Sequence, residues 1–328
     1  MKVLITGSAG HLGEGLARTL KDLNYEVAGL DILASPYTTH QGSVADRSFV
    51  RRCLDGVKII FHTATLHKPH VATHSHQDFI DTNITGTLNL LQEASTAGID
   101  RFIFTSTTSV FGDALIPPAE APAAWVTEDV TPIPKNIYGV TKAAAEDLCQ
   151  LFYRNYGLAC IILRTSRFFP EEDDHKEMRN AYPDANLKAN EYLFRRVDLE
   201  DAVSAHIVAA DRVREIGFGK YIISATTPFT QADLSQLRTH APQVVRRLFP
   251  DYEELYDHHG WKMPPGIDRV YVNERARTQL GWKPKYDFRY LLDRLKTGED
   301  DLRSPLTRLV GSKGYHTEKF LNGPYPVV

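Results

Sequence analysis

Short apolar runs alternate with longer amphipathic stretches along the first half of the chain. Buried parallel strands are predicted for the apolar runs at 3–6, 26–30, 59–62, 101–106 and 159–163. Helical spacing of apolar residues is found at 14–23, 48–54, 78–97 and 141–156. Strands that alternate with helices in this way predict an α/β fold with a parallel, doubly wound sheet and right-handed crossovers.

The pattern changes after Pro170. Residues 171–190 are polar and rich in turn-forming residues. Beyond them we predict helices at 199–212 and 288–295, a strand at 220–225, and smaller helices near 231, 241 and 274. The sequence therefore predicts a Rossmann domain at 1–170 that segments at about 195–225 rejoin, a smaller C-terminal α/β substrate-binding domain formed mainly by 171–297, and a tail of little periodicity at 298–328.

The composition argues against several classes of binding partner. Charged residues make up 24% of the chain and the formal net charge is -3, so nothing favours nucleic acid or an anionic membrane. No apolar stretch approaches the roughly 18 residues of a membrane span, and no signal peptide is recognisable before the first strand. The 3 cysteines are well separated and odd in number, which suits a reducing compartment. We expect a cytoplasmic protein that acts on a small molecule.

A glycine-rich turn, Gly7-Ser-Ala-Gly10-His-Leu-Gly13, lies between the first predicted strand and the first predicted helix. Glycine lets the backbone turn tightly and approach a pyrophosphate, which the N–H groups at the helix N-terminus then bind. Asp31 ends the second strand, where a carboxylate accepts hydrogen bonds from the adenosine ribose and repels a 2′-phosphate. This arrangement predicts NAD rather than NADP, and Arg47 is too distant in sequence to argue for NADP. The alternative is that Asp31 only caps the turn.

Tyr138 and Lys142 lie one helical turn apart on the same face of a predicted helix. The charge of Lys142 is expected to lower the pKa of Tyr138, which makes the phenolate a usable base near neutral pH. Tyr315 and Lys319 have the same spacing, but they lie in the aperiodic tail, so we treat that pair as coincidence.

Four consecutive hydroxyl residues, Ser106 to Ser109, occur at the C-terminal end of a central predicted strand. Doubly wound sheets bind ligands at this end of their strands. These side chains either satisfy backbone groups where the strand ends or include a catalytic hydroxyl.

Several motifs together identify a family. They are Thr6-Gly-x-x-Gly-x-x-Gly13, Phe61-His-Thr-Ala64, Asn83-x-x-Gly-Thr-x-Asn-Leu-Leu91, Val110-Phe-Gly112, the Tyr138/Lys142 pair and Leu280-Gly-Trp-x-Pro284. From Met1 to about Leu295 the chain resembles the extended short-chain dehydrogenase/reductases. Within that superfamily it is similar to the NAD-dependent sugar-nucleotide epimerases and dehydratases, of which UDP-glucose 4-epimerase is representative.

The resemblance implies roles for particular residues. Thr107 corresponds to the catalytic hydroxyl, Tyr138 to the acid/base, and Lys142 to the residue that tunes Tyr138 and holds the nicotinamide ribose. The implied contacts with NAD, besides Tyr138 and Lys142, come from Gly7, Gly10, His11, Leu12, Gly13, Asp31, Ile32, Ser43, Val44, Thr63 and Ala64. Ser43 stands where the family usually has an aspartate that touches the adenine, which weakens the argument for adenine recognition there.

Departures from the family pattern narrow the expected reaction. Thr108 and Ser109 stand where related dehydratases carry an Asp-Glu pair, which argues against a 4,6-dehydratase. Arg167 stands where sugar-nucleotide enzymes commonly have an asparagine on the substrate diphosphate. Arginine can bind phosphate bidentately, or it can pair with the acidic run Glu171–Asp174. The segment Phe194–Asp201 also differs from the usual Arg-Asp-aromatic pattern.

Histidines crowd the segment after the third Rossmann strand, at His67, His70, His74 and His76. Their irregular spacing and the lack of a cysteine partner disfavour zinc, so we predict no metal site. Contact of His67 or Lys68 with an anionic substrate is the preferred interpretation. The acidic run Glu171–Asp174 is expected to be a solvated face, with a cation or an amino-substituted substrate as the alternative.

The preferred function is epimerisation of a sugar nucleotide or related sugar through transient oxidation by NAD. The alternative is net oxidation or reduction of a small hydroxyl or keto compound by the same residues. A third class, a non-catalytic NAD-sensing protein, is disfavoured because Thr107, Tyr138 and Lys142 are all present. The resemblance also implies a homodimer through the helices at 78–97 and 141–156.

Overall fold

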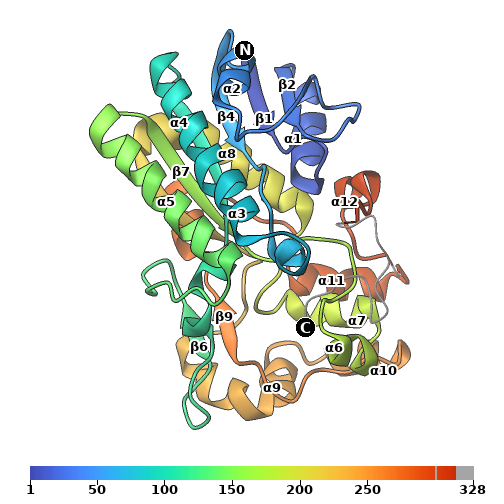
Figure 1. Ribbon diagram of the computed structural model, residues 1–328. Helices are drawn as coiled ribbons and strands as arrows, with labels where there is room; N and C mark the ends of the chain where they lie inside the picture. Colours follow the sequence, from blue (N-terminus) through green and yellow to red (C-terminus); the bar gives the residue numbers. More distant parts are fainter. Residues whose placement is uncertain (300, 315–328) are drawn as a thin grey trace.

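The computed structural model describes residues 1–299 and 301–314. Its central element is a sheet of seven strands in the order β3-β2-β1-β4-β5-β7-β8 (Figure 1). These strands are β1 (Lys2–Thr6), β2 (Glu26–Asp31), β3 (His40–Gln41), β4 (Val57–His62), β5 (Arg101–Thr107), β7 (Ala159–Thr165) and β8 (Phe218–Ile223). All the pairings are parallel, and the strand order runs outward from β1 in both directions. The predicted doubly wound parallel sheet is confirmed.

Helices cover both faces of this sheet. One face is covered by α1 (His11–Asp22) and α8 (Leu199–Ile216), the other by α2 (Arg47–Cys53), α4 (Gly86–Thr96) and α5 (Ile137–Tyr156). Successive residues of a strand point to opposite faces. Val3 and Ile5 therefore join the core under α1 and α8, whereas Leu4 joins the core under α4 and α5. Because both faces are buried, the central strands β1, β4, β5 and β7 are largely apolar in sequence, whereas the edge strand β3 is polar.

The predicted helix at 78–97 is interrupted. It consists of α3 (His76–Phe79), the π-helical turn η2 (Ile80–Thr85) and α4. The turn carries Asn83, whose side chain is almost fully buried. Such π-helical turns are often found at functional sites.

A second, smaller core lies beyond the carboxyl ends of the sheet strands (Figure 1). It includes Leu237, Val244, Tyr256 and Phe288. The elements of this part are β6 (Ala124–Val126), α6 (Lys176–Ala181), α7 (Asp184–Glu191), η5 (Gln231–Asp233), α9 (Leu234–Leu248), α10 (Tyr252–His258), β9 (Arg269–Tyr271) and α11 (Phe288–Lys296). Two further segments, η6 (Ala276–Leu280) and α12 (Pro305–Val310), pack against α8 in the main core. Strands β6 and β9 pair in parallel as a separate sheet. Three short helical turns, η1 (Lys68–Ala72), η3 (Thr108–Phe111) and η4 (Asp113–Leu115), border the main sheet.

The structure differs from the sequence prediction at several short elements. The stretch 171–190, predicted to be turns, contains α6 and α7, and the described part of the tail contains α12. Helix α6 buries no residue and α12 buries only Thr307 and Val310, so neither leaves an apolar periodicity to detect. The pair β6–β9 joins segments that are far apart in sequence, which no local pattern reveals. Tyr315 and Lys319 lie outside the described residues.

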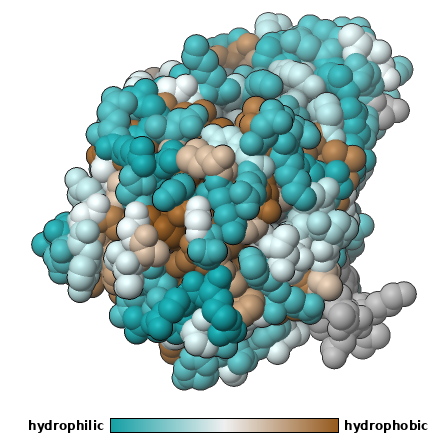
Figure 2. Space-filling model, turned by 90° about the horizontal axis from the view of Figure 1, so that it is seen from above, coloured by the Kyte–Doolittle hydropathy of each residue, from teal (hydrophilic) through white to brown (hydrophobic). Residues whose placement is uncertain are grey.

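Within the described residues, no helix combines the length and apolar character needed to cross a bilayer. In Figure 2, which views the molecule from above, hydrophilic residues cover most of the surface and hydrophobic ones are exposed between them. The three cysteines are unpaired and buried.

Candidate active site

A large cavity of about 1780 Å³ lies at the carboxyl ends of the sheet strands. Its wall contains every residue that the sequence assigned to cofactor or substrate, with the exception of Lys142. The predicted residues that line it are Gly7, Gly10, His11, Leu12, Gly13, Asp31, Ile32, Ser43, Val44, Thr63, Ala64, His67, Lys68, Thr107, Tyr138 and Arg167. The fold thus collects in one place residues from the ends of six strands and from the loops that follow them.

The glycine-rich turn requires glycine for steric reasons. A Cβ atom on Gly13 would lie 1.9 Å from the carbonyl oxygen of Gly7, and Gly7 itself has φ of +72°. Helix α1 begins directly after Gly10, which has no side chain to cap its N-terminus. The first N–H groups of α1 therefore remain available at the cavity wall, which fits a dinucleotide pyrophosphate.

Asp31 stands at the end of β2 on the cavity wall. Its two carboxylate oxygens accept hydrogen bonds from the backbone N–H groups of Ala9 and Leu33, both at 2.9 Å. The capping role is therefore real, but each oxygen keeps a second lone pair that a ribose hydroxyl can use. Arg47 instead ion-pairs with Glu93, with 2.6 Å between Nε and Oε1.

The residues predicted around the adenine and the middle of NAD are held by short contacts. The Thr63 hydroxyl donates to the carbonyl of Thr6 at 2.7 Å, and the N–H of Ala64 donates to the Thr6 hydroxyl at 3.1 Å. The Ser43 hydroxyl accepts from the N–H of Ala45 at 3.1 Å, and Val44 is buried. Ile32 is exposed at the rim.

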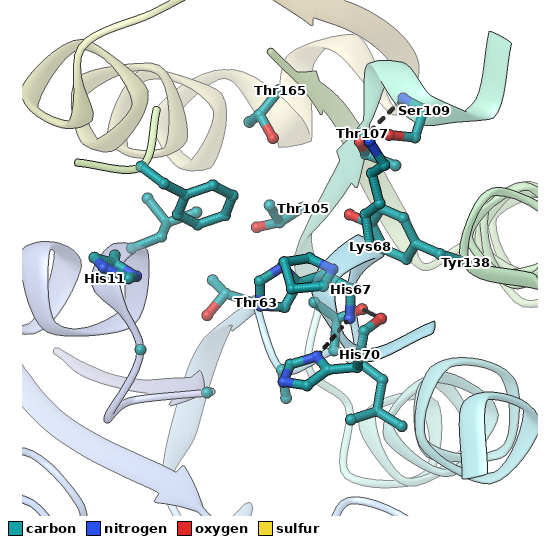
Figure 3. A pocket seen from close by; sticks show the side chains of 18 of the residues that line it. His11, Thr63, His67, Lys68, His70, Thr105, Thr107, Ser109, Tyr138 and Thr165 are labelled. Carbon is teal, nitrogen blue, oxygen red and sulfur yellow. Dashed lines mark hydrogen bonds between the residues drawn. The ribbon is translucent and has the colours of Figure 1, made fainter. Parts of the chain in front are cut away.

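Thr107 and Tyr138 meet at the boundary between the two parts of the cavity (Figure 3). Thr107 is the last residue of β5, and Tyr138 lies in the first turn of α5, where the side chain of Asn136 accepts from the N–H of Gly139 at 3.0 Å. The two side chains lie beside each other, and the Thr107 hydroxyl acts on that of Tyr138 so as to lower the pKa of the phenol. The Thr107 hydroxyl also accepts from the N–H of Ser109 at 3.0 Å. Of the hydroxyl residues after β5, Thr107 is therefore the one in contact with Tyr138.

The charges near Tyr138 differ from the sequence prediction. Burial raises the pKa of Tyr138 to about 12, opposed only by the hydroxyl of Thr107. Burial also lowers the pKa of Lys142 to about 7. The ammonium group of Lys142 lies 4.0 Å from the ring centroid of Phe104. The expectation that Lys142 lowers the pKa of Tyr138 is therefore wrong for the protein alone, because desolvation of both groups outweighs their mutual interaction.

His67 and Lys68 enter the cavity from the loop after β4 (Figure 3). The His67 ring stacks on Phe169 with 5.4 Å between centroids, and the backbone N–H of His67 donates to Nδ1 of His70 at 3.1 Å. Lys68 is in an ion pair with Asp174. Both residues line the cavity as predicted, but Lys68 already has an anionic partner.

Arg167 also lies on the cavity wall and is surrounded by carboxylates. Its guanidinium pairs with Asp173, with Asp174 at 2.8 Å and with Glu191 at 3.3 Å. The geometry favours the interpretation in which Arg167 pairs with the acidic run; contact with a substrate anion stays a prediction. Arg195 and Arg196 pair with the same Glu191, at 2.7 and 2.9 Å. We call these residues, together with Lys68, the ion-pair cluster.

The prediction that Glu171–Asp174 is a solvated face is wrong. Asp173 and Asp174 are buried in the ion-pair cluster, and Oε1 of Glu171 lies 2.8 Å from Nε2 of His11. These contacts lower the pKa of Glu171 to about 2 against the effect of burial. Glu172 alone is exposed. The cause is tertiary, since the cations that neutralise the run come from other segments.

Among the described residues, one group has the spacing of metal ligands, namely Asp173, Asp174 and His175. The histidines at 67–76 do not form such a group within this part of the chain. Both aspartates of the group are already paired with Arg167 or Lys68. The group therefore provides no argument for a metal.

Asn83 belongs to one of the family motifs, but no role was predicted for it. Its side-chain amide accepts from the N–H of Leu66 at 2.9 Å and donates to the Thr141 hydroxyl at 3.0 Å. It therefore fixes the loop after β4 to helix α5. A polar residue inside an apolar helix pattern was the available signal.

The C-terminal segment was also missed. Oε1 of Glu171 accepts from the Ser312 hydroxyl at 2.8 Å and from the backbone N–H groups of Lys313 at 3.0 Å and Gly314 at 3.2 Å. Lys313 and Gly314 line the cavity beside the glycine-rich turn. No local pattern in the sequence indicates this contact.

Known proteins resemble the chain over most of its length. The NAD dependent epimerase/dehydratase family matches residues 3–222. The low-salt glycan biosynthesis protein Agl12 of Haloferax volcanii is 31% identical over 320 residues, which cover 88% of this chain and 95% of that protein. The uncharacterized UDP-glucose epimerase YtcB of Bacillus subtilis is 29% identical over 183 residues, or 50% of this chain and 55% of the relative.

Solved structures of epimerases share the fold of this chain. The crystal structure of UDP-glucose 4-epimerase with UDP-glucose from Thermotoga maritima superimposes with a TM-score of 0.62 at 21% identity, covering 91% of this chain and 99% of that one. At this identity the likeness shows the fold. Matches to two of the curated relatives span little more than half of their lengths, 55% and 59%.

Proposed function

Because the chain belongs to the NAD dependent epimerase/dehydratase family, we propose that it epimerises a sugar nucleotide or a related sugar by transient oxidation. The observation that carries the proposal is that Thr107 and Tyr138 lie beside each other on the wall of a cavity that also contains the glycine-rich turn (Figure 3). The family is NAD-dependent, and the turn has the steric form that a dinucleotide needs. The YtcB and Thermotoga maritima proteins are named for action on UDP-glucose, which supports a UDP-sugar as the substrate class.

The proposed reaction uses one proton carrier. NAD⁺, when bound, supplies the hydride acceptor and, once reduced, the hydride donor. Tyr138 takes the proton of a substrate hydroxyl while hydride leaves the same carbon, and a ketone results. After the ketone turns in the cavity, hydride returns to its opposite face and Tyr138 gives the proton back to the oxygen. Thr107 holds the reacting oxygen through its hydroxyl, and the sum of the two steps is an isomerisation with no net redox change.

The pKa of Tyr138 sets a condition on this mechanism. With a pKa of about 12, the phenol of Tyr138 keeps its proton at neutral pH. Without a nearby positive charge, Tyr138 can therefore donate a proton but cannot accept one. A positive charge close to Tyr138 is needed to favour the phenolate. Lys142 in its ammonium form and the oxidised nicotinamide ring are the two sources of such charge.

The alternative is net oxidation or reduction of a small hydroxyl or keto compound. One observation favours it: Arg167, which stands where related enzymes contact the diphosphate, is already paired with three carboxylates. Thr107, Tyr138 and Lys142 would serve this reaction in the same way.

The test compares the two reactions directly. Purified protein is incubated with UDP-glucose or UDP-galactose without added NAD, and the sugar products and NADH absorbance are followed. Epimerised product with no net NADH supports the proposal. Turnover that requires added NAD and accumulates NADH supports the alternative. Denaturation of the same preparation, followed by chromatography of the released nucleotides, shows whether NAD is retained.

We also propose a homodimer through α4 and α5. Among the apolar residues of these helices, Leu91, Ala145 and Phe152 are buried in the protomer core, whereas Leu151 is 44% exposed. Val140 and Tyr156 on α5 are also exposed, at 48% and 65%. Sedimentation of wild type and of Leu151→Glu at micromolar concentration tests this, and a wild-type monomer contradicts it. A cytoplasmic location likewise stays a prediction.

A further inference from the structure

Glu146 is a buried carboxylate that the proposed mechanism does not use. It lies on α5 one helical turn after Lys142, and its side chain is 1% exposed. Oε1 accepts from the Ser106 hydroxyl at 2.6 Å. Nη2 of Arg164 donates to Oε2 at 2.7 Å, and Nζ of Lys220 lies 3.1 Å from the same oxygen.

These contacts join α5 to three neighbouring strands. Ser106 precedes Thr107 on β5, Arg164 lies on β7 directly opposite Ser106, and Lys220 lies on β8. Arg164 is itself fixed, since Nη1 donates to the carbonyl of Glu128 at 3.3 Å and the guanidinium lies 4.9 Å from the Phe111 ring centroid. Glu146 is thus the point where the helix that carries Tyr138 is attached to the strand that carries Thr107.

The same carboxylate faces a group of buried cations. Lys142, Arg164 and Lys220 surround it on the inner side of α5. The groups that face Lys142 are His62 from β4, the Phe104 ring from β5, and Glu146 and Cys149 from α5 itself. Burial lowers the pKa of Lys142, and the charge of Glu146 works against that shift. His62 is buried and its pKa is far below its ordinary value, so it carries no charge near neutral pH.

We propose that Glu146 is a positioning residue for the reaction, which holds the end of β5 with Thr107 against Tyr138 and keeps the ammonium form of Lys142 in place. The inference rests on the proposed function, because it assigns a purpose to the Thr107–Tyr138 contact. It gives Glu146 two effects that can be tested separately. The geometric effect acts through the hydrogen bond from Ser106, and the charge effect is that of the carboxylate on Lys142.

The charge effect is tested with Glu146→Gln, which keeps the shape and removes the charge. A negative neighbour stabilises an ammonium ion, so its removal lowers the pKa of Lys142. We expect the titration midpoint of Lys142, followed by NMR of its ¹⁵N-labelled Nζ and assigned with Lys142→Met, to fall by about one pH unit. The alkaline limb of the kcat profile is expected to move to lower pH by the same amount. An unchanged midpoint overturns the charge effect.

The geometric effect is tested with Ser106→Ala, which leaves every charge in place. We expect kcat to fall by about tenfold because Thr107 is no longer held at the correct distance from Tyr138. KM and the Lys142 midpoint are expected to stay near their wild-type values. If Ser106→Ala keeps the wild-type kcat, the geometric effect is ruled out. Glu146→Asp, whose shorter side chain keeps the charge, is expected to keep the midpoint and lose kcat, and it replaces Glu146→Gln if that variant does not fold.

Glu93→Gln is the matched control. Glu93 is also a carboxylate with a 2% exposed side chain, but it pairs with Arg47 and Arg51 away from the cavity. A purely structural role of Glu146 predicts that both variants lose thermal stability and leave the pH profile unchanged, and that result overturns the proposal. If wild type shows no turnover on any substrate, the proposed function fails, whereas the NMR titration of Lys142 still decides the inference about Glu146.

Discussion

The two halves of the cavity are built in different ways. The cofactor half depends on the glycine-rich turn, where residues a few positions apart must pass each other at distances that exclude a Cβ atom. The substrate half depends on the ion-pair cluster, in which Lys68 meets Asp174 from a distant segment and Arg167 meets Glu191 as well as its sequence neighbours Asp173 and Asp174. The steric constraints of the first kind are local, whereas the second combines pairs between near neighbours with pairs that only the fold supplies.

The ion-pair cluster has an inner and an outer layer. The carboxylates of Asp173 and Glu191 are 1% exposed, whereas the guanidinium side chain of Arg167 is 28% exposed. Arg167, Arg195 and Lys68 therefore reach the cavity together with Asp174, while Asp173 and Glu191 lie behind them. Removing one cation leaves buried carboxylates without a full complement of partners, which is costly.

The largest expected effect comes from Tyr138, where the two halves meet. Tyr138→Phe removes only the ionisable oxygen, so we expect kcat to fall by about 1000-fold while bound NAD is retained. Turnover and the NAD content of the purified protein are measured together. Tyr156→Phe, at an exposed position on the same helix, serves as the control, and appreciable activity in Tyr138→Phe means that another group is the base.

Gly13→Ala tests the steric character of the cofactor half. The added Cβ would lie 1.9 Å from the carbonyl oxygen of Gly7, so the turn has to open. We expect NAD affinity to fall by about 100-fold or more, which is about 2.7 kcal/mol. Gly98→Ala adds a Cβ where nothing lies within 4 Å, and it should cost some stability without affecting NAD. Unchanged NAD titration of Gly13→Ala contradicts the steric argument.

Arg167→Ala tests the substrate half. If Arg167 mainly neutralises Asp173, Asp174 and Glu191, the variant loses about 3 kcal/mol of unfolding free energy and KM stays constant. If it also grips an anionic group of the substrate, KM rises by about 10- to 100-fold, and Arg167→Lys recovers part of the loss. We predict that both changes occur. Thermal melts and steady-state kinetics on the same preparations separate them, and a purely thermal effect removes the substrate contact.

Asp31→Asn tests how the cofactor half selects its ligand. The carboxylate repels a 2′-phosphate, so wild type is expected to bind NAD far more tightly than NADP. The amide removes the repulsion and weakens the ribose hydrogen bonds, so the preference for NAD should shrink by about tenfold, or 1.4 kcal/mol. Titration with both cofactors measures this. Tighter binding of NADP than of NAD by wild type overturns the role given to Asp31.

The smallest expected effect is the change in the free energy of unfolding at low pH, which involves mainly carboxylates of the substrate half. The pKa values of Glu171 and Glu191 are lowered to about 2 by their partners. A lowered carboxylate pKa contributes stability that is complete above the unfolded value, about 4.3, and is lost as pH falls towards 2. The two groups together should lose about 1 kcal/mol between pH 7 and pH 4. Asp201, whose pKa burial raises to about 7, acts in the opposite sense and should gain about 3 kcal/mol over the same range, so the contribution of a glutamate is measured as a difference between wild type and variant.

Glu191→Gln provides the check on that pH dependence. Denaturant unfolding at pH 7, 5 and 4 is compared for wild type and the variant. The variant should be less stable at pH 7 and should lose less stability on acidification. Equal slopes for both proteins mean that other carboxylates cause the acid sensitivity.

The sequence predicted the main sheet except for the short edge strand β3, because the central strands are buried on both faces. Val3, Leu4 and Ile5 all enter a core, so the run is apolar without interruption. It missed α6 and α12 because these helices bury almost nothing apolar, and it missed β6 and β9 because their pairing joins distant segments. Helix 78–97 was predicted as continuous, since a π-helical turn changes the hydrogen bonding and leaves the composition unchanged.

The sequence by itself determined the glycine-rich turn, Asp31 at the end of β2, and the placement of Tyr138 and Lys142 one helical turn apart; only the family resemblance singled out Thr107. Each of the features determined by the sequence depends on residue type and spacing along the chain, where steric and helical geometry act directly. Only the tertiary structure decided the charges: that Arg167 is paired, that Asp173 and Asp174 are buried, and that the pKa of Tyr138 is raised rather than lowered. The physical reason is that charge states depend on burial and on partners that the fold brings from distant parts of the chain.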